Sequence, residues 1–318
     1  MPILKRVPAR IKKTATDSEG FILVAVLWML LALATLVTVY ATFVTRSAFA
    51  VAANSDAIKA EPLIAGGVEL AAYQLGGTPA KERPAIGHFS ARVATARLAV
   101  AYATEAARID LNAGPKPLLA GLFVALGAAL AQADMFADRI VAWRTPVPPQ
   151  NIDLDPENSF YRSAGLGYTP RHARFVHVDE LWLVHGLPAA FVQRMLPYVT
   201  VFNTQGRVDA LAAAPEVLAA LPGVTPQILQ AILAARNAGA LDQTSLQQLL
   251  GNAGAALAAG TEAKTFRVGA RVDFENGHHS AAEAVIMLPD DGTAPYRVLS
   301  WGNAFDGAAD RPLDFGGR

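Results

Sequence analysis

The sequence predicts an α/β (α+β) fold on a long N-terminal helix, and three observations indicate it. An uncharged apolar run fills residues 21–44. Short segments with alternating side chains occur at residues 86–112 and again at residues 264–301. Between them, residues 115–259 show mainly helical periodicity. We expect the early and late strands to share one sheet, with a large all-α domain inserted between strands of that sheet.

The composition allows a large core and removes several classes of function. The chain has 318 residues, a length that corresponds to about two ordinary domains. Of these residues, 53% are hydrophobic and 17% charged, so there is enough apolar surface for a large core. The net charge is zero, which does not indicate a nucleic-acid partner. There are no cysteines, and this excludes disulfides, thiolate metal sites and cysteine nucleophiles.

The first 44 residues predict a leader (residues 1–20) and a transmembrane helix (residues 21–44). The apolar run would rise roughly 36 Å at about 1.5 Å per residue, enough to cross a hydrocarbon core of about 30 Å. Basic residues precede the run, so this flank is expected in the cytoplasm and the rest of the chain in the periplasm. The basic residues are Lys5, Arg6, Arg10, Lys12 and Lys13.

Three interpretations of this N-terminus stay open. A cleaved secretory signal should have an apolar region of about 7–15 residues; this run is longer, although residues 47–53 resemble a cleavage site. A plain signal anchor is the second interpretation. The third follows from the end of the charges at Glu19, before Gly20 and Phe21. This arrangement resembles a type IV prepilin leader, which a membrane peptidase cleaves after the glycine while the helix is retained.

The parts flanking the helical block are expected to form one head. Residues 45–112 predict a stem helix, with a kink expected at Pro62, and then the first strands. Residues 261–318 predict the last strands and a tail, with a hairpin turn at Asn276 and Gly277.

The inserted domain is assigned to residues 113–260 and is expected to be wholly helical, apart from an extended loop at residues 146–169. The stretch 217–226 matches a helix-hairpin-helix (SAM-like) pattern. DNA-binding versions hold phosphate at such a turn and need nearby basic residues. Thr225, Gln227 and Gln230 stand there instead. The pattern therefore favours a structural or protein-binding hairpin and no nucleic-acid partner.

Carboxylates alternate within the predicted loop. Asp153, Asp155 and Glu157 lie there, and Asp179 and Glu180 follow later. Closely spaced carboxylates suit Ca²⁺, which prefers several hard oxygen ligands. Their spacing alone favours a solvated acidic loop, because the glycine and terminal glutamate of an EF-hand are missing. No zinc signature, nucleophile elbow, P-loop or dinucleotide motif occurs, so no catalytic set stands out in the sequence.

Several short motifs follow one another in the order of a known family. They are residues 109–112 (IDLN), 140–144 (IVAWR), 156–161 (PENSFY), 175–181 (FVHVDEL), 196–201 (LPYVTV) and 295–301 (PYRVLSW). Together with Ala25, where most pilin-like proteins have a glutamate, they resemble the type II secretion system protein K, the minor pseudopilin K family. The family's D-W-x-D motif becomes residues 142–145 here, and both acidic positions are lost.

The resemblance implies a pilin-like head and a non-enzymatic role. Such a protein is expected in the bacterial inner membrane as a single-pass protein, with its C-terminal domain in the periplasm and its leader processed by prepilin peptidase at Gly20 and Phe21. It would lie at the tip of the pseudopilus above minor pseudopilins I and J, start assembly, and meet secreted cargo and the secretin. Calcium binding carries over to Glu157, with Asp155 and Asp179 added on chemical grounds. The alternative is a membrane-anchored helix-hairpin-helix DNA-binding protein of an uptake system.

Overall fold

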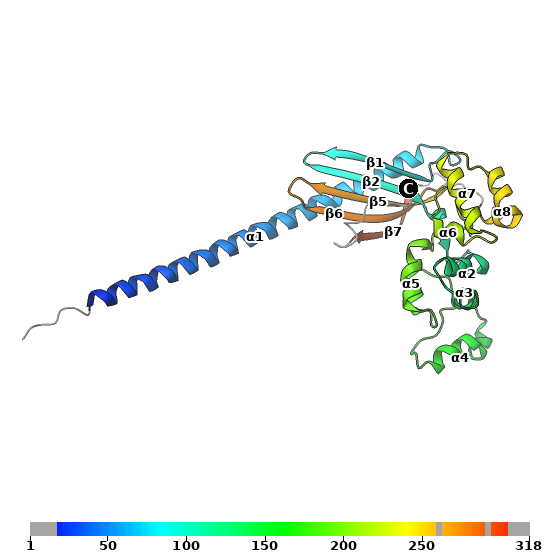
Figure 1. Ribbon diagram of the computed structural model, residues 1–318, viewed down its shortest axis with the longest axis horizontal. Helices are drawn as coiled ribbons and strands as arrows, with labels where there is room; N and C mark the ends of the chain where they lie inside the picture. The colour runs from blue at the N-terminus through cyan, green and yellow to red at the C-terminus, as the bar shows by residue number, and fades with distance from the viewer. Residues whose placement is uncertain (1–17, 259–262, 290–293, 305–318) are drawn as a thin grey trace, which may run out of the picture. The chain divides into compact units, whose positions relative to one another are not determined.

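The computed structural model describes residues 18–258, 263–289 and 294–304. It divides into two units, Met1–Lys59 and Ala60–Arg318, and helix α1 (Ser18–Gly76) belongs to both (Figure 1). Within the first unit, Phe21–Ser47 is long and apolar enough to cross a membrane, and its side chains are exposed. The helix continues past Pro62 and ends at Gly76. Residues 1–17 of the predicted leader and residues 305–318 of the tail lie outside the described residues.

The second unit contains a five-stranded antiparallel sheet in the order β1-β2-β5-β6-β7 (Figure 1). Its strands are β1 (Ile86–Val93), β2 (Ala96–Thr104), β5 (Thr265–Phe274), β6 (His279–Met287) and β7 (Arg297–Ala304). Gly277, at φ +84°, makes the predicted turn between β5 and β6. Strands β2 and β5 are neighbours in the sheet although the helical block separates them in sequence. The early and late strands therefore share one sheet, as expected.

One face of this sheet packs against the part of α1 that belongs to the same unit. Phe266, Val268, Ala270 and Val272 alternate along β5 and are fully buried, as a half-buried strand requires. Gly67 allows α1 to lie close to β2, since a Cβ on it would be 2.9 Å from Cγ2 of Val100. The sheet and α1 thus share the first of two hydrophobic cores.

The chain between β2 and β5 builds the second core. Its largest fully buried side chains include Phe123, Tyr161, Leu181 and Met195. A short parallel pair, β3 with β4, accompanies the helices, so this segment is not purely helical. Its elements are η1 (Glu105–Ala107), β3 (Ile109–Asp110), α2 (Lys116–Ala125), α3 (Leu130–Arg144), η2 (Pro149–Leu154), α4 (Pro156–Ser163), η3 (Val178–Leu183), α5 (Ala189–Met195), η4 (Leu196–Tyr198), β4 (Val199–Thr200), α6 (Pro215–Ala219), α7 (Pro226–Asn237) and α8 (Gln243–Leu257).

Two secondary-structure predictions are wrong. The loop expected at residues 146–169 contains η2 and α4. Asp155 caps α4 by accepting from the Asn158 backbone N–H, and Pro156 suits the first helical turn. Residues 178–183, expected to be helical as part of the inserted domain, form only the short 3-10 helix η3. There the Glu180 side chain accepts from the Val176 backbone N–H, a local bond that competes with α-helical hydrogen bonding.

Candidate functional site

The family-like motifs contact one another in the core of the segment between β2 and β5. The first of these contacts is made by Asn112. Its Nδ2 donates to the carbonyl of Phe175 at 3.0 Å, and the Phe175 N–H donates back to Oδ1 at 2.7 Å. Asn112 follows β3, where the Asp110 carboxylate accepts from the backbone N–H groups of Asn112 and Ala113 and shapes the turn. One side chain thus satisfies both backbone groups of a buried residue 63 positions later.

Trp143 adds a second connection. Its ring stacks on Phe175, with centroids 6.0 Å apart and planes at 26°. Its Nε1 donates to Oε2 of Glu180 at 3.2 Å. The other oxygen of Glu180 accepts from the Val176 N–H at 2.9 Å and from Arg171 at 2.7 Å. Trp143 therefore links α3 to Phe175 through a ring contact and to Glu180 of η3 through a hydrogen bond.

Tyr161 joins the same cluster from α4. It is fully buried, and its hydroxyl oxygen accepts from the backbone N–H of His185 at 2.8 Å. Burial raises the pKa of Tyr161 to about 12, so the phenol stays neutral. We call Asn112, Trp143, Tyr161, Phe175 and Glu180 the motif hub. Its polar groups connect distant segments, so its chemistry is that of a structural cross-link.

The predicted processing residues lie in α1. Gly20 is within the helix, and the side chain of Phe21 is 75% exposed. Cleavage after Gly20 stays a prediction.

The predicted metal ligands each have another partner. Oε2 of Glu157 is 2.6 Å from Nη1 of Arg139. Asp155 caps α4 and lies 3.2 Å from Nε2 of His172. Asp179 is exposed beside His177. Among the described residues, no group of three or more His, Cys, Asp or Glu side chains could hold a metal ion.

These placements do not fit a calcium ion. Burial raises the pKa of Glu157, and Arg139 opposes that rise. Oε1 of Glu157 is buried and has no hydrogen-bond partner in the described part of the chain, but a guanidinium already neutralises this carboxylate. Sequence reasoning missed Arg139. The available signal was the loss of both acidic positions of the family motif, which are Ala142 and Thr145 here.

A buried ion network connects the sheet to the segment that contains the hub. Glu105, in η1, is 1% exposed, and its Oε1 accepts from Nε of Arg267 in β5 at 2.7 Å. The hydroxyl of Thr200 also donates to it, and Arg267 bridges to Glu283. Burial raises the pKa of Glu105, but Arg267 and Arg108 outweigh burial and hold the pKa below its usual range. Glu105 is therefore ionised at neutral pH.

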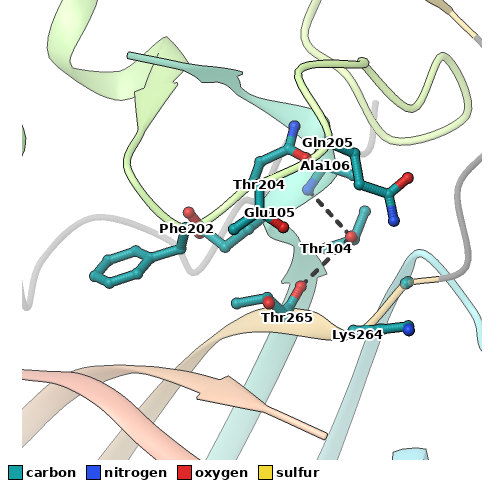
Figure 2. Close-up of a pocket in the computed structure, with 10 residues that line it drawn as sticks. Thr104, Glu105, Ala106, Phe202, Thr204, Gln205, Lys264 and Thr265 are labelled. Atoms are coloured by element: carbon teal, nitrogen blue, oxygen red, sulfur yellow. Dashed lines mark hydrogen bonds between the residues drawn. The ribbon is translucent and has the colours of Figure 1, made fainter. Parts of the chain in front are cut away.

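Two cavities flank this network. The smaller, of about 50 Å³, lies beside Thr104, whose hydroxyl accepts from the Ala106 N–H and donates to the Thr265 carbonyl (Figure 2). That volume suits a few waters. The larger, of about 310 Å³, is lined by residues that include Arg108, Tyr198 and Glu216. It mixes both signs of charge and presents no uniform potential to a ligand.

Comparison with known proteins agrees with this arrangement. The family model described as "Type II secretion system (T2SS), protein K" matches residues 97–204, a range that contains the whole motif hub. A solved chain from the GspK-GspI-GspJ complex of the enterotoxigenic Escherichia coli type 2 secretion system is similar with a TM-score of 0.52 and 16% identity. The similarity covers 80% of this chain and 96% of that one. No curated protein matches in sequence. Residues 97–204 thus belong to the type II secretion system protein K family, and the resemblance that the motifs indicated is confirmed.

Proposed function

We propose that the protein is a minor pseudopilin at the tip of the periplasmic pseudopilus of a type II secretion system. It assembles with minor pseudopilins I and J, initiates the pseudopilus and supports export of folded proteins across the outer membrane. The observation that carries the proposal is the family match over residues 97–204. The shared fold with a chain from the GspK-GspI-GspJ complex supports it.

Two features favour the tip position. Ala25 replaces the glutamate that most pilin-like proteins carry at this point of the apolar helix, so the subunit lacks a charge for the amine of a neighbour. The segment between β2 and β5 adds a second core to the sheet-and-helix head. Such an addition would clash with neighbours inside a packed fibre but is tolerated at its end.

The anchor supports a location in the inner membrane. Phe21–Ser47 suits a single span, and the basic residues before it favour a cytoplasmic leader and a periplasmic C-terminal domain. Prepilin peptidase cleaves between Gly20 and Phe21 in this proposal. The role is non-enzymatic, with secreted cargo and the secretin as further partners, because the hub residues act as structural cross-links.

Co-purification tests the assembly. The full chain in detergent is mixed with minor pseudopilins I and J from the same organism, and the complex mass is measured by size exclusion with light scattering. We expect one species that contains all three proteins and is lost when I or J is omitted. Failure to form any complex with either partner would contradict the proposal.

Mass spectrometry of the N-terminus tests the processing. The chain is co-expressed with the prepilin peptidase, and we expect a mature protein that begins with N-methylated Phe21. Gly20→Val should block cleavage because a β-branched side chain replaces the glycine before the cut. An intact N-terminus in the unchanged chain would indicate a plain anchor, and cleavage near Ala50 a secreted protein.

A further inference from the structure

Two partly buried arginines of α3 connect this helix to other parts of the segment between β2 and β5. Arg139 donates to Glu157 of α4 at 2.6 Å. Its guanidinium also lies 3.8 Å from the ring centroid of Phe160 on the same helix. One side chain therefore contacts α4 by a charge-assisted hydrogen bond and by a cation–π contact. Both groups of the ion pair are largely buried, since 22% and 13% of their side-chain surfaces are exposed.

Arg144, at the end of α3, connects this helix to the turn between β3 and α2. It donates to the backbone carbonyls of Leu111 and, at 2.7 Å, of Gly114. Both carbonyls belong to the turn between β3 and α2. Burial lowers the pKa of Arg144, and Asp110 opposes that decrease. Arg139 and Arg144, which we call the arginine brace, thus tie α3 to α4 and to the β3–α2 turn.

The brace uses the oxygens that a calcium ion would need. Carboxylate and backbone carbonyl oxygens are the ligands that Ca²⁺ prefers. Here Glu157 and the carbonyls of Leu111 and Gly114 already accept from guanidinium groups. A divalent cation beside Arg139 would also be repelled at short range in a poorly solvated site.

Two other acidic groups nearby, Asp155 and Glu180, also have partners, although Oε1 of Glu157 and Oδ2 of Asp110 are buried without a hydrogen-bond partner in the described part of the chain. Asp155 accepts from the first turn of α4 and faces His172. Glu180 accepts from Arg171, from Trp143 and from the Val176 N–H. Among the described residues, no carboxylate set is left to bind a metal. The loss of both acidic positions in residues 142–145 agrees with this picture.

We propose that the arginine brace performs in this protein the cross-linking that a bound divalent cation would otherwise supply. The segment between β2 and β5 then folds and keeps its stability without calcium. This inference concerns only the chain itself and does not depend on its partners in secretion.

Thermal unfolding of the full chain in detergent tests the inference. It is followed by tryptophan fluorescence and by far-UV circular dichroism, with millimolar CaCl₂ in one sample and millimolar EGTA in another. We expect the same Tm in both, and calorimetric titration with CaCl₂ should give no binding heat. A Tm that rises by several degrees in CaCl₂ would overturn the inference, and this arm needs no variant to fold.

A matched pair of variants tests the brace itself. Arg139→Met keeps the length of the side chain but leaves the Glu157 carboxylate buried without its cation. Arg92→Met breaks the exposed pair with Glu275, whose side chains are 75% and 61% exposed. We expect Arg139→Met to lower Tm by several degrees and Arg92→Met to leave it almost unchanged, while Arg139→Lys should lie between. Equal values for Arg139→Met and Arg92→Met would show that the brace carries no stability.

Discussion

Glu105 and Arg267 form a buried ion pair between the segment that follows β2 and the strand β5, with Nε 2.7 Å from Oε1. Thr200 of β4 donates to the same carboxylate. Glu105 is the first residue after β2. The pair therefore fixes the start of the segment between β2 and β5 to strand β5 of the sheet. The stability of that connection is therefore the most direct test of the fold.

Glu105→Ala should strongly destabilise the protein. Among the described residues, the change leaves buried Arg267 with Glu283 as its remaining carboxylate partner, and breaking a buried pair costs about 3–5 kcal/mol. Urea unfolding of the full chain in detergent, followed by circular dichroism, measures the loss. The control is Glu275→Ala, which removes an exposed pair with Arg92 worth about 1 kcal/mol at most. Similar losses in the two variants would contradict the role of the buried pair.

The Glu105 pair should weaken in acid. The pKa of Glu105 is lower in the folded state than its usual value, so its charge stabilises the fold above the unfolded pKa. This stabilisation is lost as pH falls through the folded pKa. The difference in unfolding free energy between the natural chain and Glu105→Gln should be largest near neutral pH and shrink in acid. A difference that does not change with pH would contradict the ion-pair interpretation.

Asp209→Asn should behave in the opposite way. Burial raises the pKa of Asp209, so stability is lost as pH rises above the unfolded pKa and through the folded pKa. Asparagine keeps the acceptor for the Leu211 N–H, which donates to Oδ1 at 2.9 Å. The variant should gain stability over the natural chain as pH rises, and the two should converge in acid. Urea unfolding across this range measures the gain, and a loss at neutral pH would contradict it.

Asn112→Ala should destabilise the protein by removing the hydrogen bonds of the motif hub to Phe175. The N–H and carbonyl of Phe175 lose their partner, and each unsatisfied buried group costs about 1–3 kcal/mol. We expect a loss of about 2 kcal/mol or more in urea unfolding, with a weaker near-UV signal from Trp143. Asn237→Ala serves as control because Asn237 is exposed at the end of α7. A loss of stability no larger than that of the control would argue against this role of Asn112.

Gly121→Ala should separate α2 from α6. A Cβ on Gly121 would overlap the backbone carbonyl of Ala220, and a backbone atom cannot move aside as a side chain can. We expect a loss of about 1–3 kcal/mol in thermal or urea unfolding. Gly66→Ala, in α1, meets nothing within 4 Å and should stabilise by up to about 1 kcal/mol through helix propensity. The two substitutions should therefore change the free energy of unfolding in opposite directions.

Features that depend only on neighbouring residues can be predicted from the sequence. The apolar span, the alternation along β5 and the turn at Asn276 and Gly277 are local patterns, and the structure has an apolar helix, a strand and a hairpin there. The order of the motifs was sufficient to indicate the family. These signals are reliable because side-chain periodicity and turn geometry follow from the backbone alone.

Which distant groups meet depends on tertiary packing. The sequence pattern predicts a loop where the structure has α4, because eight residues carry too little periodicity; the Asp155 cap and the buried Tyr161 stabilise this helix. The sequence pattern makes Glu157 a candidate cation ligand, but in the structure Arg139 lies 2.6 Å from its carboxylate. A carboxylate does not reveal its counter-ion in sequence, because either a metal or a guanidinium can neutralise it. Which of them does so depends on how α3 and α4 pack.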